Sequence, residues 1–445
     1  SSLTGGATPR GDLLISTRSL TNITLLPGSR VRAGAGVRLA ELRRVLAAEG
    51  LYYPPIPTYD GAFVGGTIAT NAAGAATFKY GSTRPWVDSI SVILADGSHV
   101  EIQRGAVSAS PQGFFELERP SGEVSQIPVP TYAMPDVAKL SAGYFARPGM
   151  DLIDLFIGSE GTLGIVTEAT LRVIPLPRRL VALVPFESDH QAVALTAALR
   201  NAARSSWQGK GHVDVSAIEF MDGRALALVP DEAFSRANVT RPHRDAGLLL
   251  VQLELTDNGD ATLEELGAIL DACDVDTDPQ IAMPDDERGA TRLFELREAV
   301  PSSLNAMIAA AKLRVHPDLQ KTAGDFVVPF ERLEESIALY RDVFNRFGVE
   351  HAIWGHVSDG NMHPNLVPRS IDDVKRGKEA LVEMSRAVGK MGGAPMAEHG
   401  VGRTALKQQM LRELYGERGI EEMRAVKRAL DPEWKLAPGV LFPEP

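Results

Sequence analysis

The sequence predicts an α+β protein with two unlike domains, and three observations support this fold class. Residues 1–180 are rich in Gly, Ala and Thr and contain short apolar runs typical of strands. Beyond Pro177, strand-like and helix-like segments alternate over residues 181–400. Residues 401–445 open with a long helix-like stretch and end in a short Pro-rich tail, which is expected to pack back onto the first domain.

The first domain is expected to contain short strands and one clear helix. Strands are predicted over residues 89–94 and 171–174, because each apolar run is followed by turn or breaker residues. A helix is predicted over residues 39–49, where Gly50 stops the pattern. Residues 105–140 are rich in Pro, Ser and Gly, which indicates an irregular insertion.

The second domain repeats a strand–helix–strand rhythm twice. The expected segments are strand 180–186, helix 190–204 and strand 213–220, followed by strand 248–255, helix 261–272 and a later strand. This rhythm indicates a ferredoxin-like α+β domain, in which helices cover an antiparallel sheet. Longer helices are predicted after it at residues 291–311, 329–347, 371–391 and 405–430.

Composition excludes several function classes. The formal net charge is −11 and the pI is near 5.4, so there is no basic surplus to bind nucleic-acid phosphates. The single cysteine, Cys273, excludes an internal disulfide and a CxxC metal pair. With no signal peptide and no apolar run near the ~18 residues of a membrane span, a cytoplasmic location is expected, either unattached or peripheral to the membrane. Because the chain opens inside a Gly-rich loop, we expect a further segment upstream of Ser1.

Three Gly-rich segments lie in the first domain, at residues 1–6, 64–74 and 158–167. Glycine lets backbone N–H groups approach a pyrophosphate closely, and Ser and Thr hydroxyls add donors. None of the three is a GxGxxG motif after a strand, and there is no GxxxxGK[ST] loop, so neither a Rossmann nor a P-loop nucleotide site is indicated. Taken one at a time, each segment is more simply explained as an ordinary turn, since short Gly motifs often occur by chance.

Taken together, these segments and Lys79-Tyr80-Gly81 resemble the PCMH-type FAD-binding domain of the vanillyl-alcohol-oxidase flavoprotein superfamily. Gly355–His363, Glu398–Gly402 and Lys427–Pro432 resemble the branch that contains D-lactate dehydrogenase, glycolate oxidase and D-2-hydroxyglutarate dehydrogenase. The resemblance covers nearly the whole chain. It implies that the first domain is a two-lobed FAD-binding domain and that the second is a cap over the isoalloxazine ring.

The resemblance also implies where FAD binds. The pyrophosphate would lie on the first Gly-rich segment, the flavin ring beside the second, and the nucleotide near the third. The residues implied are, in that order, Ser2, Leu3, Thr4, Gly5 and Gly6, then Gly65, Gly66, Thr67, Asn71 and Gly74, and then Glu160, Gly161, Ile165 and Val166. The first segment has no His or Cys, so the flavin is expected to be non-covalent. Departures from the family pattern lie at Ala323, Lys407 and Val440, in the pocket wall, and they leave the substrate side chain open.

Two histidines flank the turn dipeptide Asp359-Gly360. A two-residue hairpin turn there would pair His356 directly with His363, with their Cβ atoms roughly 5 Å apart on one sheet face. Imidazoles at that separation can share one ion, and Glu398 would complete a two-His, one-carboxylate set for a divalent metal. Zinc is favoured, although manganese or iron would also fit. The alternative is a pair of structural histidines beside a turn.

A metal held in this way suggests how a 2-hydroxy acid would react. Its carboxylate and hydroxyl oxygens can chelate the ion, which lowers the pKa of the hydroxyl. The resemblance implies that Arg297 binds the substrate carboxylate, with a helix-surface salt bridge as the alternative, and Asn365 is a weaker candidate for the same task. His399 is the expected base, because a neutral imidazole accepts a proton near pH 7. Its alternatives are a third metal ligand and a packing residue.

The sequence as a whole predicts FAD-dependent oxidation of a small 2-hydroxy acid, of the D-lactate, glycolate or D-2-hydroxyglutarate type, to the 2-oxo acid. One alternative is a flavoenzyme like alkyl-dihydroxyacetone-phosphate synthase, without net oxidation. Another is a non-catalytic flavin-binding subunit of a larger oxidase, which would have no need of these histidines. The hydroxy acid, the electron acceptor and the oligomeric state, homodimer or oxidase subunit, stay open.

Overall fold

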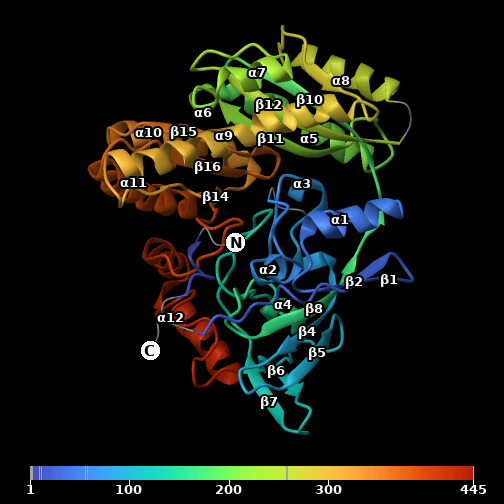
Figure 1. The fold of residues 1–445 in the computed structure, drawn as a ribbon, viewed down its shortest axis with the longest axis vertical. Coiled ribbons are helices and arrows are strands. Elements are labelled where there is room, and N and C mark those ends of the chain that lie inside the picture. Colours follow the sequence, from blue (N-terminus) through green and yellow to red (C-terminus); the bar gives the residue numbers. More distant parts are fainter. Residues whose placement is uncertain are drawn as a thin grey trace. The chain divides into compact units, whose positions relative to one another are not determined.

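The computed structural model describes residues 4–9, 11, 13–55, 57, 59–256 and 259–443. They form two compact units, each with its own main sheet (Figure 1). Unit 1 comprises the described residues of 1–74, 80–176 and 394–445, and unit 2 comprises those of 75–79 and 177–393. Both units combine helices with antiparallel sheets, which confirms the predicted α+β class. None of the described helices is long and apolar enough to cross a membrane.

Unit 1 is built on a five-stranded antiparallel sheet in the order β1-β2-β8-β4-β5. Its strands are β1 (Ile23–Leu26), β2 (Arg30–Gly34), β4 (Val87–Ile93), β5 (His99–Gln103) and β8 (Ile165–Arg172). A two-stranded ribbon joins β3 (Leu51–Tyr52) to β9 (Ile174–Pro175). The predicted strand 89–94 is thus β4, and 171–174 spans the end of β8 and the start of β9.

Residues 105–140 contain a regular hairpin, contrary to the expectation of an irregular insertion. β6 (Phe114–Glu118) pairs with β7 (Val124–Pro128). Phe115 and Leu117 are buried while Glu116 is exposed, an alternation typical of a half-buried strand. The prediction failed because the Pro, Ser and Gly residues around these two short strands dominate the composition.

The helices of unit 1 are mostly short. They are α1 (Leu39–Ala48), α2 (Val64–Ala69), η2 (Arg84–Trp86), α4 (Ile153–Phe156) and α12 (Ala405–Leu430). The helix α3 (Thr77–Tyr80) crosses the boundary between the units, and only its last residue belongs to unit 1. The predicted helix 39–49 is α1, and Gly50 follows it with a left-handed φ of 67°. α12 packs against β7, and its buried Lys427 donates to the Asp431 carboxylate at 2.8 Å.

Unit 2 is built on a seven-stranded antiparallel sheet in the order β13-β10-β12-β11-β15-β16-β14. Its strands are β10 (Arg178–Phe186), β11 (Val215–Asp222), β12 (Gly247–Leu255), β13 (Gln280–Ala282), β14 (Phe326–Val327), β15 (His351–His356) and β16 (Asn361–Leu366). The first four strands in sequence lie in the order fourth, first, third, second. This is the split strand–helix–strand arrangement expected of a ferredoxin-like domain. The β15–β16 hairpin and β14 extend that sheet beyond β11.

The helices of unit 2 include those predicted between residues 190 and 391. They are α5 (Asp189–Ser206), α6 (Gly223–Leu226), α7 (Asp231–Ala237), α8 (Asp260–Ala272), α9 (Glu287–Arg314), η3 (Phe330–Arg332), α10 (Leu333–Arg346), η4 (Val357–Asp359) and α11 (Ile371–Lys390). The two short helices α6 and α7 were not expected. They connect β11 to β12 and contribute buried side chains to the core.

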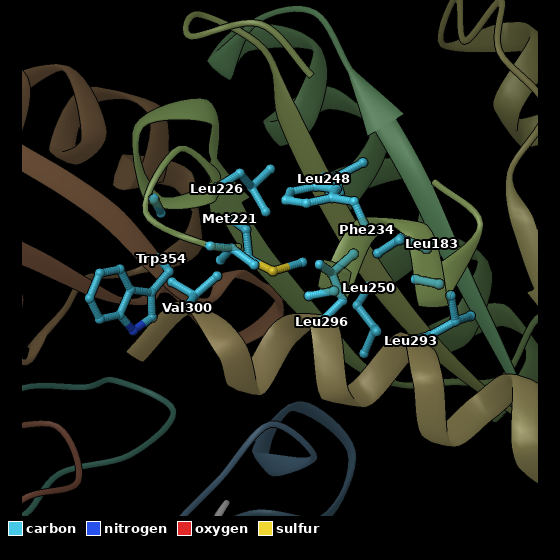
Figure 2. Packing of buried hydrophobic residues seen from close by; sticks show 14 of the residues in the cluster. Leu183, Met221, Leu226, Phe234, Leu248, Leu250, Leu293, Leu296, Val300 and Trp354 are labelled. Atoms are coloured by element: carbon cyan, nitrogen blue, oxygen red, sulfur yellow. The ribbon is translucent and has the colours of Figure 1, made fainter. Parts of the chain in front are cut away.

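α9 lies along one face of this sheet, and apolar side chains hold it there (Figure 2). Leu296 and Val300 from α9 belong to one buried cluster with Leu250, Met221 and Trp354 from β12, β11 and β15. Because side chains alternate along a strand, the residues two positions from Met221 and Trp354 point to the same face. Glu219 of β11 and His356 of β15 therefore lie beside α9, at the edge of an apolar core.

Candidate functional site

Three glycines of unit 1 have free space where a side chain would stand, which fits the close approach of a cofactor to their backbone. At Gly5, Gly66 and Gly161, no atom of the described residues, apart from the adjoining residues and the backbone of the glycine's own helix, lies within 4 Å of the point where a Cβ would stand. Gly5 and Gly161 have φ values of 71° and 76°, which glycine adopts without strain. One of these glycines lies in each of the three segments predicted to hold FAD, so the described residues fit a pyrophosphate-bearing group. Ser2 and Leu3, predicted with them, lie outside the described residues.

Three other predicted FAD residues are held by unit 1 itself. The N–H of Gly65 donates to the Ala35 carbonyl at 2.9 Å, and a Cβ on Gly65 would lie 2.7 Å from the Ala35 side chain. The Thr67 hydroxyl donates to a carbonyl of its own helix, α2. The Asn71 side chain accepts from the Arg84 N–H at 2.9 Å. These three residues therefore shape the second segment. The remaining predicted residues are buried or half-buried, namely Thr4, Gly6, Gly74, Ile165 and Val166.

Glu160 braces the loop that carries Glu398 and His399. Its carboxylate accepts from the N–H groups of Val401 at 2.7 Å and Gly402 at 2.8 Å. Burial raises the pKa of Glu160, although these two donors act against the rise. Gly400 has a φ of 75°, which favours glycine, and a Cβ there would lie 2.8 Å from the same carboxylate and would displace it. The third Gly-rich segment is thus joined to a loop some 240 residues further along the chain.

Glu398 is paired with a buried lysine in unit 1. Its Oε2 lies 3.1 Å from Nζ of Lys139, whose side chain is 0% exposed. Its Oε1 lies 3.3 Å from Nε2 of His399, which is about one-third exposed. The Glu398 carboxylate thus contacts a buried cation and an imidazole at once. The sequence reading missed Lys139, and its only signal was a charged residue within the apolar stretch 137–142.

The hairpin that carries the two candidate metal histidines differs from the prediction. Its loop has four residues, 357–360, not two, because η4 precedes Gly360 with its left-handed φ of 80°. His363 therefore lies opposite Trp354, and His356 lies opposite Asn361. The shift of two residues leaves both histidines on the same sheet face, as diagonal neighbours. Their ring centroids are 5.4 Å apart at an interplanar angle of 88°, so the predicted proximity holds within unit 2.

Arg297 is buried, and it is paired with a buried glutamate as well as with the half-exposed Glu298. Arg297 lies on α9 and is 7% exposed. Its Nε donates to Oε2 of Glu219 at 2.6 Å, while Oε1 of Glu219 contacts Nδ1 of His356. Burial by itself raises the pKa of Glu219, but the charge of Arg297 and the hydrogen bonds from His356 and Arg297 outweigh that effect and bring the pKa to about 2. Glu219 was not predicted, although a glutamate inside the apolar strand 215–222 was visible in the sequence.

The second histidine and Asn365 lie on the same polar face of unit 2. Nδ1 of His363 is 3.7 Å from Oδ1 of Asp325, and Asp325 is 1% exposed. The Asn365 amide donates to the His363 carbonyl at 2.7 Å, while its side-chain oxygen is buried without a hydrogen-bond partner among the described residues. A buried acceptor without a donor costs about 1–3 kcal/mol, which fits a group that meets a ligand or water. Imidazole and carboxylate donors on one face also fit a divalent ion.

Comparison with protein families identifies both halves of the chain. Residues 177–441 match the model of the C-terminal domain of FAD linked oxidases, and residues 1–103 match an FAD binding domain. Glycolate oxidase subunit GlcD of Bacillus subtilis is 28% identical over 99% of this chain and 82% of its own length. D-lactate dehydrogenase of Archaeoglobus fulgidus is 28% identical over 98% and 83%. D-2-hydroxyglutarate dehydrogenase of Stutzerimonas stutzeri is 30% identical over 92% and 76%.

Solved structures with a similar fold include an alkyldihydroxyacetonephosphate synthase. It aligns with 95% of this chain and 67% of its own chain, with a TM-score of 0.57 and 15% sequence identity. At that identity the likeness concerns the fold alone. It confirms the two-domain α+β architecture.

Proposed function

Because this chain belongs to the FAD linked oxidases and is an FAD-linked oxidoreductase, we propose that it oxidises a small D-2-hydroxy acid to the 2-oxo acid. The similar glycolate oxidase subunit and D-lactate and D-2-hydroxyglutarate dehydrogenases support a 2-hydroxy acid as the substrate class. The reaction removes a hydride from carbon and a proton from oxygen, and the site must provide for both.

We propose that His356, His363 and Glu398 hold a divalent metal, with zinc the best match to two imidazoles and a carboxylate. When bound, FAD supplies a hydride acceptor, and the ion supplies a Lewis acid that favours loss of the hydroxyl proton. His356 and His363 come from one hairpin of unit 2, and Glu398 comes from unit 1.

Three side chains would bind the substrate and move the proton. Arg297 binds the substrate carboxylate with a guanidinium that Glu219 already holds in place. Asn365 is the weaker candidate for the same carboxylate, to which only its side-chain amide N–H groups can donate. His399 receives the hydroxyl proton on its imidazole, and the Glu398 carboxylate 3.3 Å from Nε2 stabilises the resulting cation.

One observation carries the proposal: buried polar groups gather on one sheet face of unit 2, at the edge of an apolar core. Charged and amide side chains are seldom fully buried unless they are paired or bind something. If His356 and His363 were purely structural, nothing would explain why the side-chain oxygen of the nearby Asn365 is buried without a hydrogen-bond donor among the described residues.

The test is anaerobic mixing of the FAD-loaded protein with a panel of D- and L-2-hydroxy acids while the flavin absorbance is followed. We expect bleaching by at least one D-hydroxy acid and reoxidation by an artificial acceptor dye. A flavin that stays oxidised with every hydroxy acid would reject the proposal in favour of a flavoenzyme without net oxidation or a non-catalytic subunit.

A further inference from the structure

Glu219 connects two candidate functional residues of unit 2. One is His356, a candidate metal ligand, and the other is Arg297, the candidate group for the substrate carboxylate. Glu219 lies on β11, is 3% exposed, and uses its two carboxylate oxygens for different partners. Oε1 contacts Nδ1 of His356, which is directly opposite on β15. Oε2 accepts from both Nε and Nη2 of Arg297 on α9, each at 2.6 Å.

We propose that Glu219 is a positioning residue that prepares His356 to bind a metal and, through its other oxygen, holds Arg297 for the substrate. This inference rests on the proposed function, because it assumes that His356 is a metal ligand. Glu219 itself touches neither metal nor substrate in this scheme.

The effect on His356 follows from the chemistry of imidazole. A neutral ring carries one proton, and the nitrogen without it is the one that binds a metal. A carboxylate oxygen can only accept, so the contact with Glu219 requires the proton on Nδ1. Nε2 then keeps its lone pair for the ion, and the contact also fixes the plane of the ring.

The effect on Arg297 is one of direction. A guanidinium that shares Nε and Nη2 with one carboxylate oxygen cannot turn about its long side chain. The Nη1 corner is held more loosely, since it lies 3.3 Å from Oε1 of Glu298, which is 45% exposed. Glu219 therefore fixes the orientation of the Arg297 guanidinium through its Nε and Nη2 groups.

The side chain at position 219 must accept hydrogen bonds from His356 and Arg297 at the same time. Only a carboxylate has two acceptor oxygens for this. The amide of glutamine is similar in size but has a single oxygen. In Glu219→Gln, that oxygen can face His356 or Arg297, but not both. If it faces charged Arg297, the amide N–H points at Nδ1, and the His356 proton moves to Nε2. That tautomer cannot bind a metal through Nε2.

The experiment measures zinc affinity by chelator competition in the folded, FAD-loaded protein. We expect Glu219→Gln to bind zinc about 10–100-fold more weakly than the wild type. The double variant Glu219→Gln/Arg297→Met should recover zinc affinity to within about threefold of the wild type, because the amide oxygen can then turn to His356. Glu298→Gln is the matched control, since it alters an Arg297 partner that does not contact His356, and its zinc affinity should match the wild type.

A second readout needs no metal. Nitrogen-15 NMR of labelled histidines in the zinc-free protein, with the His356 signal assigned by its loss in His356→Gln, reports which ring nitrogen is protonated. The proton should lie on Nδ1 in the wild type and leave it in Glu219→Gln. Unchanged zinc affinity in Glu219→Gln, or an unchanged His356 tautomer, would overturn the inference. A wild type that binds no zinc would instead reject the metal in the proposed function, and the NMR comparison would still decide the role of Glu219.

Discussion

Carboxylates contact the histidines that are expected to bind metal or accept a proton. The side-chain contacts of these carboxylates join residues that are far apart in the sequence. The contact of Glu398 with Lys139 spans 259 positions, and that of His356 with Glu219 spans 137. Histidine is rare here, with nine residues in the chain, and His356, His363 and His399 lie within four residues of Gly360 or Gly400, so the sequence pointed to them. Their partners could not be predicted, because spacing along the sequence says nothing about contacts made across a sheet or between loops.

His399 is the residue whose loss should affect the reaction most directly. Replacing a general base slows a reaction by roughly 10²–10⁴-fold. We therefore expect His399→Ala to keep FAD and metal but to reduce flavin at least ~100-fold more slowly with the preferred hydroxy acid. Stopped-flow measurement of flavin reduction, with metal and flavin content determined on the same samples, checks this. Near-normal reduction would remove His399 from the mechanism, and loss of metal would make it a ligand.

At the scale of elements, the β15–β16 hairpin shows what a short motif can and cannot predict. Asp359-Gly360 correctly predicted a reversal of the chain between His356 and His363. It did not reveal the extra turn of η4, which lengthens the loop and shifts the register by two residues. The histidines remain neighbours only because the shift is even, since a shift of one residue would have sent one of them to the opposite face.

Gly360 is expected to be essential to this hairpin. Its φ is 80°, and an added Cβ would collide with the carbonyl oxygen of Val328. Gly97 is a matched control, because its φ is 85° but no atom of the described part of the chain, its two neighbours apart, lies within 4 Å of its Cβ position. We expect Gly360→Ala to lower the free energy of unfolding by about 1–3 kcal/mol more than Gly97→Ala does. Urea denaturation of both variants measures the difference, and equal losses would contradict the close approach to Val328.

The same hairpin should govern metal content. If His356 and His363 are ligands, the double variant His356→Ala/His363→Ala loses two of three protein donors. Elemental analysis should find close to one divalent ion per chain in the wild type and a small fraction of that in the variant. His190→Ala/His243→Ala, which removes two exposed histidines of unit 2, is the control that should keep its metal. Unchanged metal in the first variant would return the two histidines to a structural role.

At the scale of the whole molecule, the alternation of strands and helices was enough to predict the core of unit 2. Mostly apolar runs such as 248–255 are long, so their type and approximate ends could be predicted. The addition of β15, β16 and β14 to that sheet could not be predicted, because no local pattern says which edge a later hairpin will join. In unit 1, strands as short as β6 and β7 were hidden by the turn residues around them.

The cofactor of the whole protein is expected to be released intact by acid. The first Gly-rich segment has no His or Cys to form a flavin bond, and open glycine backbone fits a reversible complex. Acid precipitation should leave yellow FAD in the supernatant at about one equivalent per chain. Flavin that stays with the precipitated chain would show a covalent link at another residue, and a colourless preparation from cells rich in flavin would contradict FAD binding.

Glu160 has a consequence for the order in which the protein is made. Unit 2 is almost continuous in sequence and can fold on the ribosome once residue 393 has emerged. Unit 1 begins to be synthesised first but is completed last, because Glu160 must wait for the N–H groups of Val401 and Gly402. A nascent chain therefore carries an unfinished flavin-binding half throughout synthesis of the other unit. Capture of FAD is then a late event of biogenesis, and a chain that stops before residue 400 should leave the ribosome unable to retain it.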